Sequence, residues 1–311
     1  MVCIAPRIIL RNGVDIPKNV RGLWHAMSSN DRALDSKELI RTYPEYFMIV
    51  PCKQCRPCRK SLARMWTVRL LYESDYWNKL SFVSLDYAPE FLPFLPDGSN
   101  LGTLYQIPYN LGSTLDKDAV PKFMKRLRTN YYRDHGVKLA CKVYYCGEYG
   151  DLGRPHYHLI LFGLDHSDRD VLERSWPYGR VDIAHVELES IQYVTGYVQK
   201  KLNGNLGSEV YGDRVVPFGH SSKGLGLNYF LDHKSRFYQD LKAHLQGRKV
   251  TIPRYFLDHD EDLTALLEST FSDDLLKSYL EDPRQFWTDN GNRYCESVRG
   301  TVTHAAKKSK F

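Results

Sequence analysis

Two histidines separated by one residue, His156 and His158, are the first residues in this chain whose type and spacing suggest chemistry. They lie in an apolar run typical of a β-strand, in which alternate side chains share a face and their Cα atoms lie roughly 7 Å apart. Two imidazoles at this spacing can share one divalent metal ion. Because a His-x-His arises by chance in about four of ten chains of this composition, the pair needs support from other residues.

Glu148 gives that support. It lies at the end of the preceding predicted strand, and the turn-rich stretch 147–155 predicts an antiparallel hairpin that returns its carboxylate to His156 and His158. Two imidazoles and one carboxylate leave open positions on a metal ion, which could then polarise a phosphodiester. Asp151, in the same turn, is the alternative carboxylate.

A nucleophile is also needed, and pairs of tyrosines with three residues between them are candidates. Pro108 interrupts one such pair and the predicted hairpin turn interrupts another, which leaves the first and the last pair on predicted helices. The four pairs are Tyr72/Tyr76, Tyr105/Tyr109, Tyr145/Tyr149 and Tyr193/Tyr197.

The last pair has the best geometry for chemistry. In a predicted helix over residues 187–202, Tyr193, Tyr197 and Lys200 cluster within about 60° on the side away from the apolar stripe. Both phenols are therefore expected to face a cleft. A phenol with a usual pKa of about 10 is a weak nucleophile at neutral pH, so we assign Lys200 the role of favouring the phenolate, with Lys201 as the alternative.

The elements that must position these side chains follow from hydrophobic periodicity. Their irregular mixture predicts an α+β fold with a central antiparallel sheet flanked by helices. We expect an N-terminal segment over residues 1–58, a central domain over 59–234 and a helical C-terminal segment over 235–311. Strands are predicted over residues 81–86, 142–146, 156–162 and 178–183, and helices over 59–77, 118–133 with Asp118 as N-cap, 187–202, 235–245 and 263–279.

Composition is compatible with a nucleic-acid partner. The 311 residues carry a formal charge of +6, and 13% of them are aromatic, so cations for phosphates and rings for unpaired bases are both available. No apolar run approaches the roughly 20 residues that cross a bilayer, so no membrane span is expected. Seven cysteines without a secretory leader favour a reducing cytoplasm.

Basic side chains near these motifs are the candidates for DNA contacts. The predicted helix over residues 118–133 has an apolar stripe and presents cations elsewhere, although a solvated surface is the alternative role for any one of them. The candidates for DNA contacts are Lys122, Lys125, Arg126, Arg154 and Lys201.

Cys52, Cys55 and Cys58 form a second cluster with the spacing of thiolate ligands to zinc. A structural zinc site usually has four ligands, so a fourth would be needed. The alternative is three reduced thiols at the start of a helix. The residues that could supply the fourth ligand are Cys3, Cys141, Cys146, Cys295 or a histidine.

Three motifs together resemble the replication initiators of small single-stranded DNA phages. They are Cys-Gly-Glu-Tyr-Gly over residues 146–150, Gly-Arg-Pro-His-Tyr-His over 153–158 and Tyr-Val-Thr-Gly-Tyr-Val-Gln-Lys-Lys over 193–201. Such initiators belong to the His-hydrophobic-His endonuclease superfamily, in its two-tyrosine branch. The gokushovirus-type microvirus replication proteins are the most similar, and the resemblance covers residues 50–230.

The resemblance implies that Glu148, His156 and His158 hold Mg²⁺ or Mn²⁺ and that Tyr193 and Tyr197 are the nucleophiles. It implies a rolling-circle initiator in which one tyrosine cuts the origin, forming a 5′-phosphotyrosyl end, and the other cuts the regenerated copy. The expected partners are single-stranded DNA at the origin and a host helicase and DNA polymerase in the host bacterial cytoplasm.

Two departures and two alternatives accompany this interpretation. Tyr157 stands between the histidines where an aliphatic residue is usual, and Asp86 replaces a more usual hydroxyl residue in the first strand motif. The alternative functions are a non-catalytic single-stranded DNA-binding protein and a metal phosphodiesterase that uses water in place of tyrosine. A phosphotyrosyl adduct with DNA would separate the first function from both.

Overall fold

A computed structural model describes residues 7–10, 15–26, 39–50, 55–102, 112–150, 153–197, 205–270 and 281. These residues fall into two compact units. One contains the described residues up to Ser61 and those from Thr264 onward, and the other contains those from Leu62 to Leu263. The three-part division expected from the sequence stays a prediction.

The smaller unit is built on a two-stranded antiparallel sheet. Strand β1 (Arg7–Leu10) pairs with β2 (Phe47–Val50), and helix α1 (Lys18–Ala26) and the 3-10 turn η1 (Pro44–Tyr46) accompany them. Apolar side chains of these elements and of residues 39–40 form a small core of their own. Its buried members are Ile16, Val20, Trp24, Leu39, Ile40 and Phe47.

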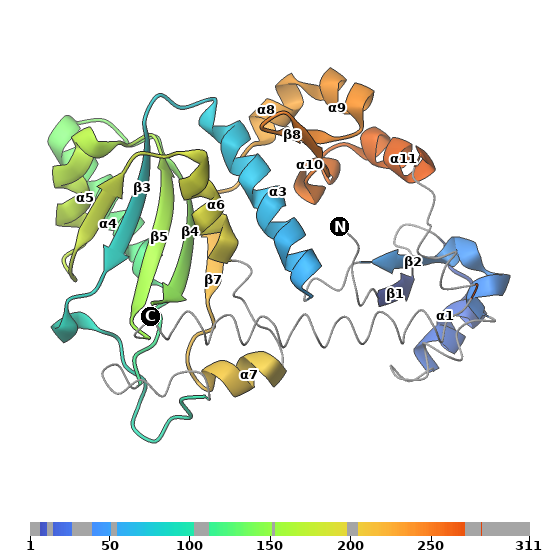
Figure 1. Cartoon of the computed structure of the whole chain (residues 1–311), viewed down its shortest axis with the longest axis horizontal. Helices are drawn as coiled ribbons and strands as arrows, with labels where there is room; N and C mark the ends of the chain where they lie inside the picture. Colours follow the sequence, from blue (N-terminus) through green and yellow to red (C-terminus); the bar gives the residue numbers. More distant parts are fainter. Residues whose placement is uncertain are drawn as a thin grey trace. The chain divides into compact units, whose positions relative to one another are not determined.

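A five-stranded sheet lies at the centre of the larger unit (Figure 1). Its strand order is β6-β3-β5-β4-β7, and each neighbouring pair is antiparallel. The β4–β5 hairpin expected from the sequence lies inside it, with β5 as the central strand. The strands are β3 (Leu80–Asp86), β4 (Lys142–Tyr149), β5 (Pro155–Phe162), β6 (Val181–Ala184) and β7 (Phe218–Ser221).

Helices cover both faces of this sheet, as the α+β expectation required (Figure 1). On one face, Tyr157 and Leu159 of β5 belong to a core shared with α4 (Ala119–His135) and α5 (Arg169–Ser175). On the other, alternate β5 residues pack with Leu70 of α3 (Arg56–Ser74) and Val194 of α6 (Leu188–Gly196). Alternation along β5 thus divides its side chains between two separate cores.

Helix α4 begins after Asp118, but the cap predicted there is wrong. Asp118 has helical backbone angles and its side chain makes no capping hydrogen bond. Instead, the Asp118 N–H donates to Oδ1 of Asp116 at 2.8 Å, which makes a local turn before the helix. Gly136 ends the helix in the left-handed conformation, with φ of 69°.

The helix predicted over residues 235–245 is wrong in its second half. Helix α9 (Lys234–Asp240) ends because Leu241 adopts a left-handed conformation with φ of 48°. Residues 243–245 then form β8 (Ala243–Leu245), which pairs with β9 (Arg248–Val250). Backbone pairing therefore replaces helix here.

The remaining elements differ from expectation mainly at their ends. The strand predicted from residue 178 begins at Val181 in β6. The predicted helices over 187–202 and 263–279 begin as expected, and their last parts lie outside the described residues. The other elements are η2 (Pro89–Phe91), η3 (His166–Asp168), α7 (Asn205–Tyr211), α8 (Leu227–Asp232), α10 (Arg254–Leu257) and α11 (Glu261–Thr270).

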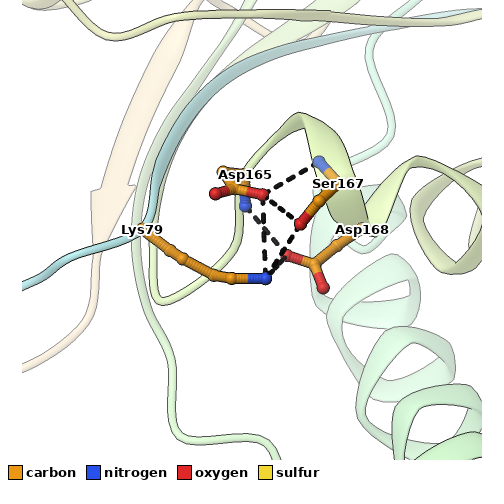
Figure 2. A network of polar contacts seen from close by, with 4 residues as sticks. All are labelled: Lys79, Asp165, Ser167 and Asp168. Carbon is orange, nitrogen blue, oxygen red and sulfur yellow. Dashed lines mark hydrogen bonds and ion pairs between the residues drawn. The ribbon is translucent and has the colours of Figure 1, made fainter.

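A polar network fixes the start of β3 to the connection that follows β5 (Figure 2). The Lys79 ammonium donates to Asp168 at 2.8 Å and to Ser167 at 3.0 Å, and it lies 3.7 Å from Asp165. Asp165 and Asp168 also form a reciprocal capping box around η3. One lysine therefore holds two segments together at the end of the sheet where Leu80 pairs with Phe162.

No helix among the described residues combines the length and apolar character of a membrane-spanning segment.

Candidate metal centre

The β4–β5 hairpin brings one carboxylate and two imidazoles together. Glu148 is the direct cross-strand partner of His156, and His158 follows two residues later on the same face. Oε1 of Glu148 lies 3.0 Å from Nε2 of His156 and 3.3 Å from Nε2 of His158. Within the described part of the chain, this is the one group of three or more potential ligands gathered closely enough for a metal ion. Asp151 lies outside the described residues.

The second nitrogen of each imidazole is occupied by a partner that turns Nε2 toward Glu148. Nδ1 of His156 lies 3.2 Å from the Arg154 carbonyl oxygen, and Nδ1 of His158 lies 2.8 Å from the Ser84 hydroxyl. A carbonyl only accepts, so Nδ1 of His156 carries the proton and Nε2 keeps its lone pair. Metal-binding histidines are commonly held in this way by a second partner.

The centre has the chemistry that a divalent ion needs. Nε2 of His158 is buried and makes no hydrogen bond, because its contact with Glu148 lacks the required geometry. A buried nitrogen lone pair without a donor is costly unless a ligand takes it. The side chain of Glu148 is 3% exposed, so a cation beside it would also neutralise a buried charge. The three side chains therefore fit Mg²⁺ or Mn²⁺, with open positions left for a substrate.

The two imidazoles differ in their electrostatics. Burial tends to lower the pKa of His156, but the hydrogen bond and the negative charge of Glu148 raise it above its usual value. For His158, burial dominates and lowers the pKa, and a charged His156 adds to that lowering. A proton on the pair would thus reside on His156, the ring that hydrogen-bonds Glu148 at 3.0 Å.

Helix α6 carries two phenol rings against His158. The Tyr197 ring stacks nearly parallel on the imidazole, with centroids 5.3 Å apart and planes 11° apart. The Tyr193 ring meets the same imidazole edge-on at 5.3 Å, and the two phenol rings are 4.8 Å apart. The structure therefore brings both tyrosines of the Tyr193/Tyr197 pair to the three candidate ligands.

The two phenols are not equivalent, which the helical wheel did not anticipate. Tyr193 is 52% exposed, whereas Tyr197 is 6% exposed and belongs to the core between the sheet and the helices α3 and α6. Burial and the nearby charge and hydrogen bond of Glu148 raise the pKa of Tyr197 well above its usual value. The expectation that both phenols face a cleft is thus not what the structure has for Tyr197, because its ring lies flat on His158.

Apolar packing and one buried hydroxyl pair hold α6 in place. Ile191 and Val194 insert into the core beside β5. The hydroxyls of Thr195 and Thr67, on α6 and α3, share a hydrogen bond of 2.9 Å. A capping box between Glu187 and Ser190 starts the helix.

The other tyrosine pairs do not reach this centre. Tyr72 stacks on Tyr229 with centroids 4.0 Å apart. Tyr145 and Tyr149 point into the core on the opposite face of the sheet. Tyr105 and Tyr109 lie outside the described residues.

The basic side chains expected to contact DNA are spread over several places. Lys122, Lys125 and Arg126 belong to α4, which packs on the sheet face opposite to the imidazoles. Lys122 lies 3.6 Å from Asp116, and the Arg126 guanidinium donates to the Ser175 carbonyl oxygen at 2.8 Å. DNA contact by these three residues stays a prediction.

Arg154 lies beside the centre, where its guanidinium donates to the Tyr87 carbonyl oxygen. Lys200 and Lys201 lie outside the described residues, so their predicted roles stay predictions. The same holds for Cys52. Cys55 is buried and Cys58 is half-buried, and zinc binding by this cluster stays a prediction.

Sequence reasoning missed two residues of the centre, Ser84 and Phe82. Both lie on β3 and face the imidazoles, and the Phe82 ring stacks 5.6 Å from His158 and meets Tyr193 at 6.2 Å. Alternation along residues 80–86 puts them on one face with Asp86. The missing information was that β3 is the neighbour of β5, with Ser84 opposite His158.

The two departures from the family pattern have clear structural places. Tyr157 points away from the imidazoles, and its buried hydroxyl donates to the Asp116 carbonyl oxygen at 2.8 Å and accepts from the Asp116 N–H at 2.9 Å. Asp86 is the cross-strand partner of His156 at the end of β3. Neither residue displaces the three candidate ligands.

Comparisons with known proteins agree with the resemblance of the motifs. A family model for replication-associated proteins of the ORF2 type matches residues 103–202, the stretch that contains the candidate ligands and both tyrosines. No solved structure gives a significant match.

Three phage proteins are similar over most of the chain. Replication-associated protein ORF4 of Chlamydia phage 1 is 29% identical over 67% of this chain, and the match spans about half of that relative, 53% of its length. Replication-associated protein VP4 of Bdellovibrio phage phiMH2K is 26% identical over 91% of this chain and 93% of its own. Replication-associated protein ORF2 of Spiroplasma virus 4 is 27% identical over 76% and 73%. These matches confirm that the chain resembles the replication-associated proteins of microviruses.

Proposed function

We propose that this protein initiates rolling-circle DNA replication by nicking one DNA strand and joining its 5′ end to a tyrosine of α6. The observation that carries the proposal is the contact of both phenol rings with the imidazole of His158, which shares a candidate metal centre with Glu148 and His156. A nucleophile beside a three-ligand centre is the arrangement that cleavage of a phosphodiester by a side chain needs.

The reaction exchanges one phosphoester for another. The phenol oxygen of a tyrosine attacks the scissile phosphorus, the bond to the 3′ oxygen breaks, and the phenol proton is lost as the 3′ hydroxyl gains one. Because the new phosphotyrosyl ester replaces the old diester, the strand can be resealed by the reverse reaction without ATP. Mg²⁺ or Mn²⁺ at the centre would supply the charge that stabilises the phosphate in the transition state.

The chain's own residues orient these parts. Ser84 and the Arg154 carbonyl fix the two imidazoles, and Phe82 packs against both His158 and Tyr193. Single-stranded DNA at a replication origin is the proposed substrate. A host helicase and a host DNA polymerase are the proposed partners in the host cytoplasm.

The test uses a single-stranded circle that carries this gene with its flanking sequence, incubated with the full chain and Mn²⁺. We expect a protein–DNA adduct that survives boiling in detergent. Tyr193→Phe/Tyr197→Phe, which removes both hydroxyls and keeps both rings, should lose the adduct and still bind DNA. His156→Ala should lose the adduct by weakening the metal centre.

Two results would contradict the proposal. Binding without cleavage in every metal ion would favour a non-catalytic DNA-binding protein. Cleavage that yields free 5′ phosphates, with no adduct and no loss in the double phenylalanine variant, would favour a phosphodiesterase that uses water.

A further inference from the structure

We propose that the two tyrosines act in a fixed order, with Tyr193 making the first cut and Tyr197 held back until helix α6 moves. This inference rests on the proposed function, because it assigns the two nucleophiles of that reaction to different steps.

Exposure separates the two phenols. Tyr193 is 52% exposed, and its ring is held from two sides, by His158 and by Phe82. A phosphodiester arriving from solvent can therefore reach an oriented phenol beside the candidate metal centre. Tyr193 needs no rearrangement to act.

Tyr197 has the opposite environment. Its ring is 6% exposed, lies flat on the His158 imidazole and packs in the core with Val194 and Ile191. A phosphorus atom bears four oxygen substituents and two sugar–phosphate chains, so it cannot approach a phenol in that position. Tyr197 can attack only after α6 has moved relative to β5.

The buried hydroxyl pair of Thr67 and Thr195 opposes that movement. Thr195 lies between the two tyrosines on α6, is 1% exposed, and hydrogen-bonds Thr67 of α3 at 2.9 Å. Residues four apart on a helix differ by about 6 Å along its axis and about 40° around it. Bringing Tyr197 to the position of Tyr193 therefore pulls Thr195 away from Thr67. We assign these two threonines a positioning role that keeps Tyr193 presented.

The order gives each phenol a distinct reaction. Tyr193 attacks the origin phosphodiester and releases a 3′ hydroxyl, which becomes the primer end. After one round, Tyr197 attacks the regenerated junction and releases a second 3′ hydroxyl. That hydroxyl attacks the phosphorus held by Tyr193, which reforms a diester and returns the phenol of Tyr193. Each step breaks one phosphoester bond and forms one.

The experiment maps the first adduct in the full chain. A single-stranded circle carrying the gene is incubated with excess protein and Mn²⁺ but without a polymerase, so that only the first cut occurs. Peptide mass spectrometry of the adduct should locate the DNA on Tyr193. Tyr193→Phe should slow adduct formation by about 10³-fold or more, as expected for loss of a nucleophile. Tyr197→Phe should still form the adduct but fail to release circles when replication proteins are added.

The outcomes separate this inference from the proposed function. An adduct found mainly on Tyr197, or equally on both residues, would overturn the order and leave the nicking function standing. Absence of any adduct in the unmodified protein would overturn both.

The threonine pair has its own test, in which the readout is the share of first adducts on each tyrosine. Thr67→Val keeps the shape and removes the hydroxyl, and it should raise the share on Tyr197 about five-fold, the factor that an ordinary hydrogen bond is worth. Thr129→Val is the matched control, because its hydroxyl bonds the Lys125 carbonyl oxygen within α4 on the other sheet face. An unchanged share in Thr67→Val, with an unchanged melting temperature, would remove the threonines from the proposal.

Discussion

At the scale of single residues, one hydroxyl group decides how His158 is presented. The hydrogen bond from Nδ1 to Ser84 leaves Nε2 directed at Glu148. We expect Ser84→Ala to weaken Mn²⁺ binding by about 10- to 100-fold, the range found when a partner of a metal-binding histidine is removed. Isothermal titration calorimetry of Mn²⁺ into the protein measures this directly.

Ser81→Ala is the matched control for that prediction. Ser81 lies on the same strand, but it points to the other face and its buried hydroxyl makes no hydrogen bond. Removing that hydroxyl should leave Mn²⁺ affinity unchanged. Equal affinity in Ser84→Ala and the unmodified protein would mean that the serine does not orient the ring.

The candidate ligands could be predicted from the sequence, whereas their supports could not. Strand alternation and a hairpin turn were sufficient to bring Glu148 to His156, because hairpin neighbours are close in the chain. Ser84 comes from a strand more than seventy residues away, and nothing local specifies which strand lies beside β5. The burial of Tyr197 was missed because a helical wheel describes one helix and not the imidazole on which the ring stacks.

At the scale of elements, the Lys79 network should contribute measurably to the stability of the sheet. Lys79→Met removes the contacts with Ser167 and Asp168 that join β3 to η3 (Figure 2). Because Lys79 is partly exposed, we expect a loss of about 0.5 to 1 kcal/mol in the free energy of unfolding at neutral pH. Thermal or urea unfolding measures it, and Lys138→Met at an exposed position of the chain is the control.

The pH dependence of that loss has a definite sign. Hydrogen bonds from Ser167, aided by the Lys79 charge, hold the pKa of Asp165 below its usual 3.8. A carboxylate with a lowered pKa stabilises the fold above its unfolded pKa and loses that effect as the pH falls through its folded pKa. The pKa of Lys79 is raised by Asp168, so the ammonium stays charged throughout the neutral range. The difference between Lys79→Met and the unmodified protein should therefore be constant near neutrality and shrink in strong acid, and a difference that grew in acid would contradict this account.

Elements held by periodicity were predictable, and those set by single backbone conformations were not. The strands β4 and β5 and the helix α4 follow their apolar patterns closely. Helix α9 stops at Leu241, a residue with no sequence signal for a left-handed conformation. The pairing of β8 with β9 then takes residues that a helical pattern had included.

At the scale of the whole molecule, the buried carboxylate should make stability depend on metal ions. Glu148 lies in the interior beside two imidazoles, and an ion that binds the folded state alone stabilises it by mass action. At a concentration one hundred times the dissociation constant, Mn²⁺ should add about 2.7 kcal/mol, seen as a higher melting temperature. Glu148→Gln, which keeps the shape and loses the charge, should show little or no shift. An equal shift in both proteins would place the stabilising ion elsewhere.

Strand β5 lies in two cores, and its two faces answer to different constraints. Substitutions at residues 157, 159 and 161 should act on folding, whereas those at 156 and 158 should act on catalysis while the protein stays folded. A saturation scan along this strand would thus give a tolerance profile with a period of two. Divergence in one function can then proceed without disturbing the other, since every second position is insulated from its neighbours by the thickness of the backbone.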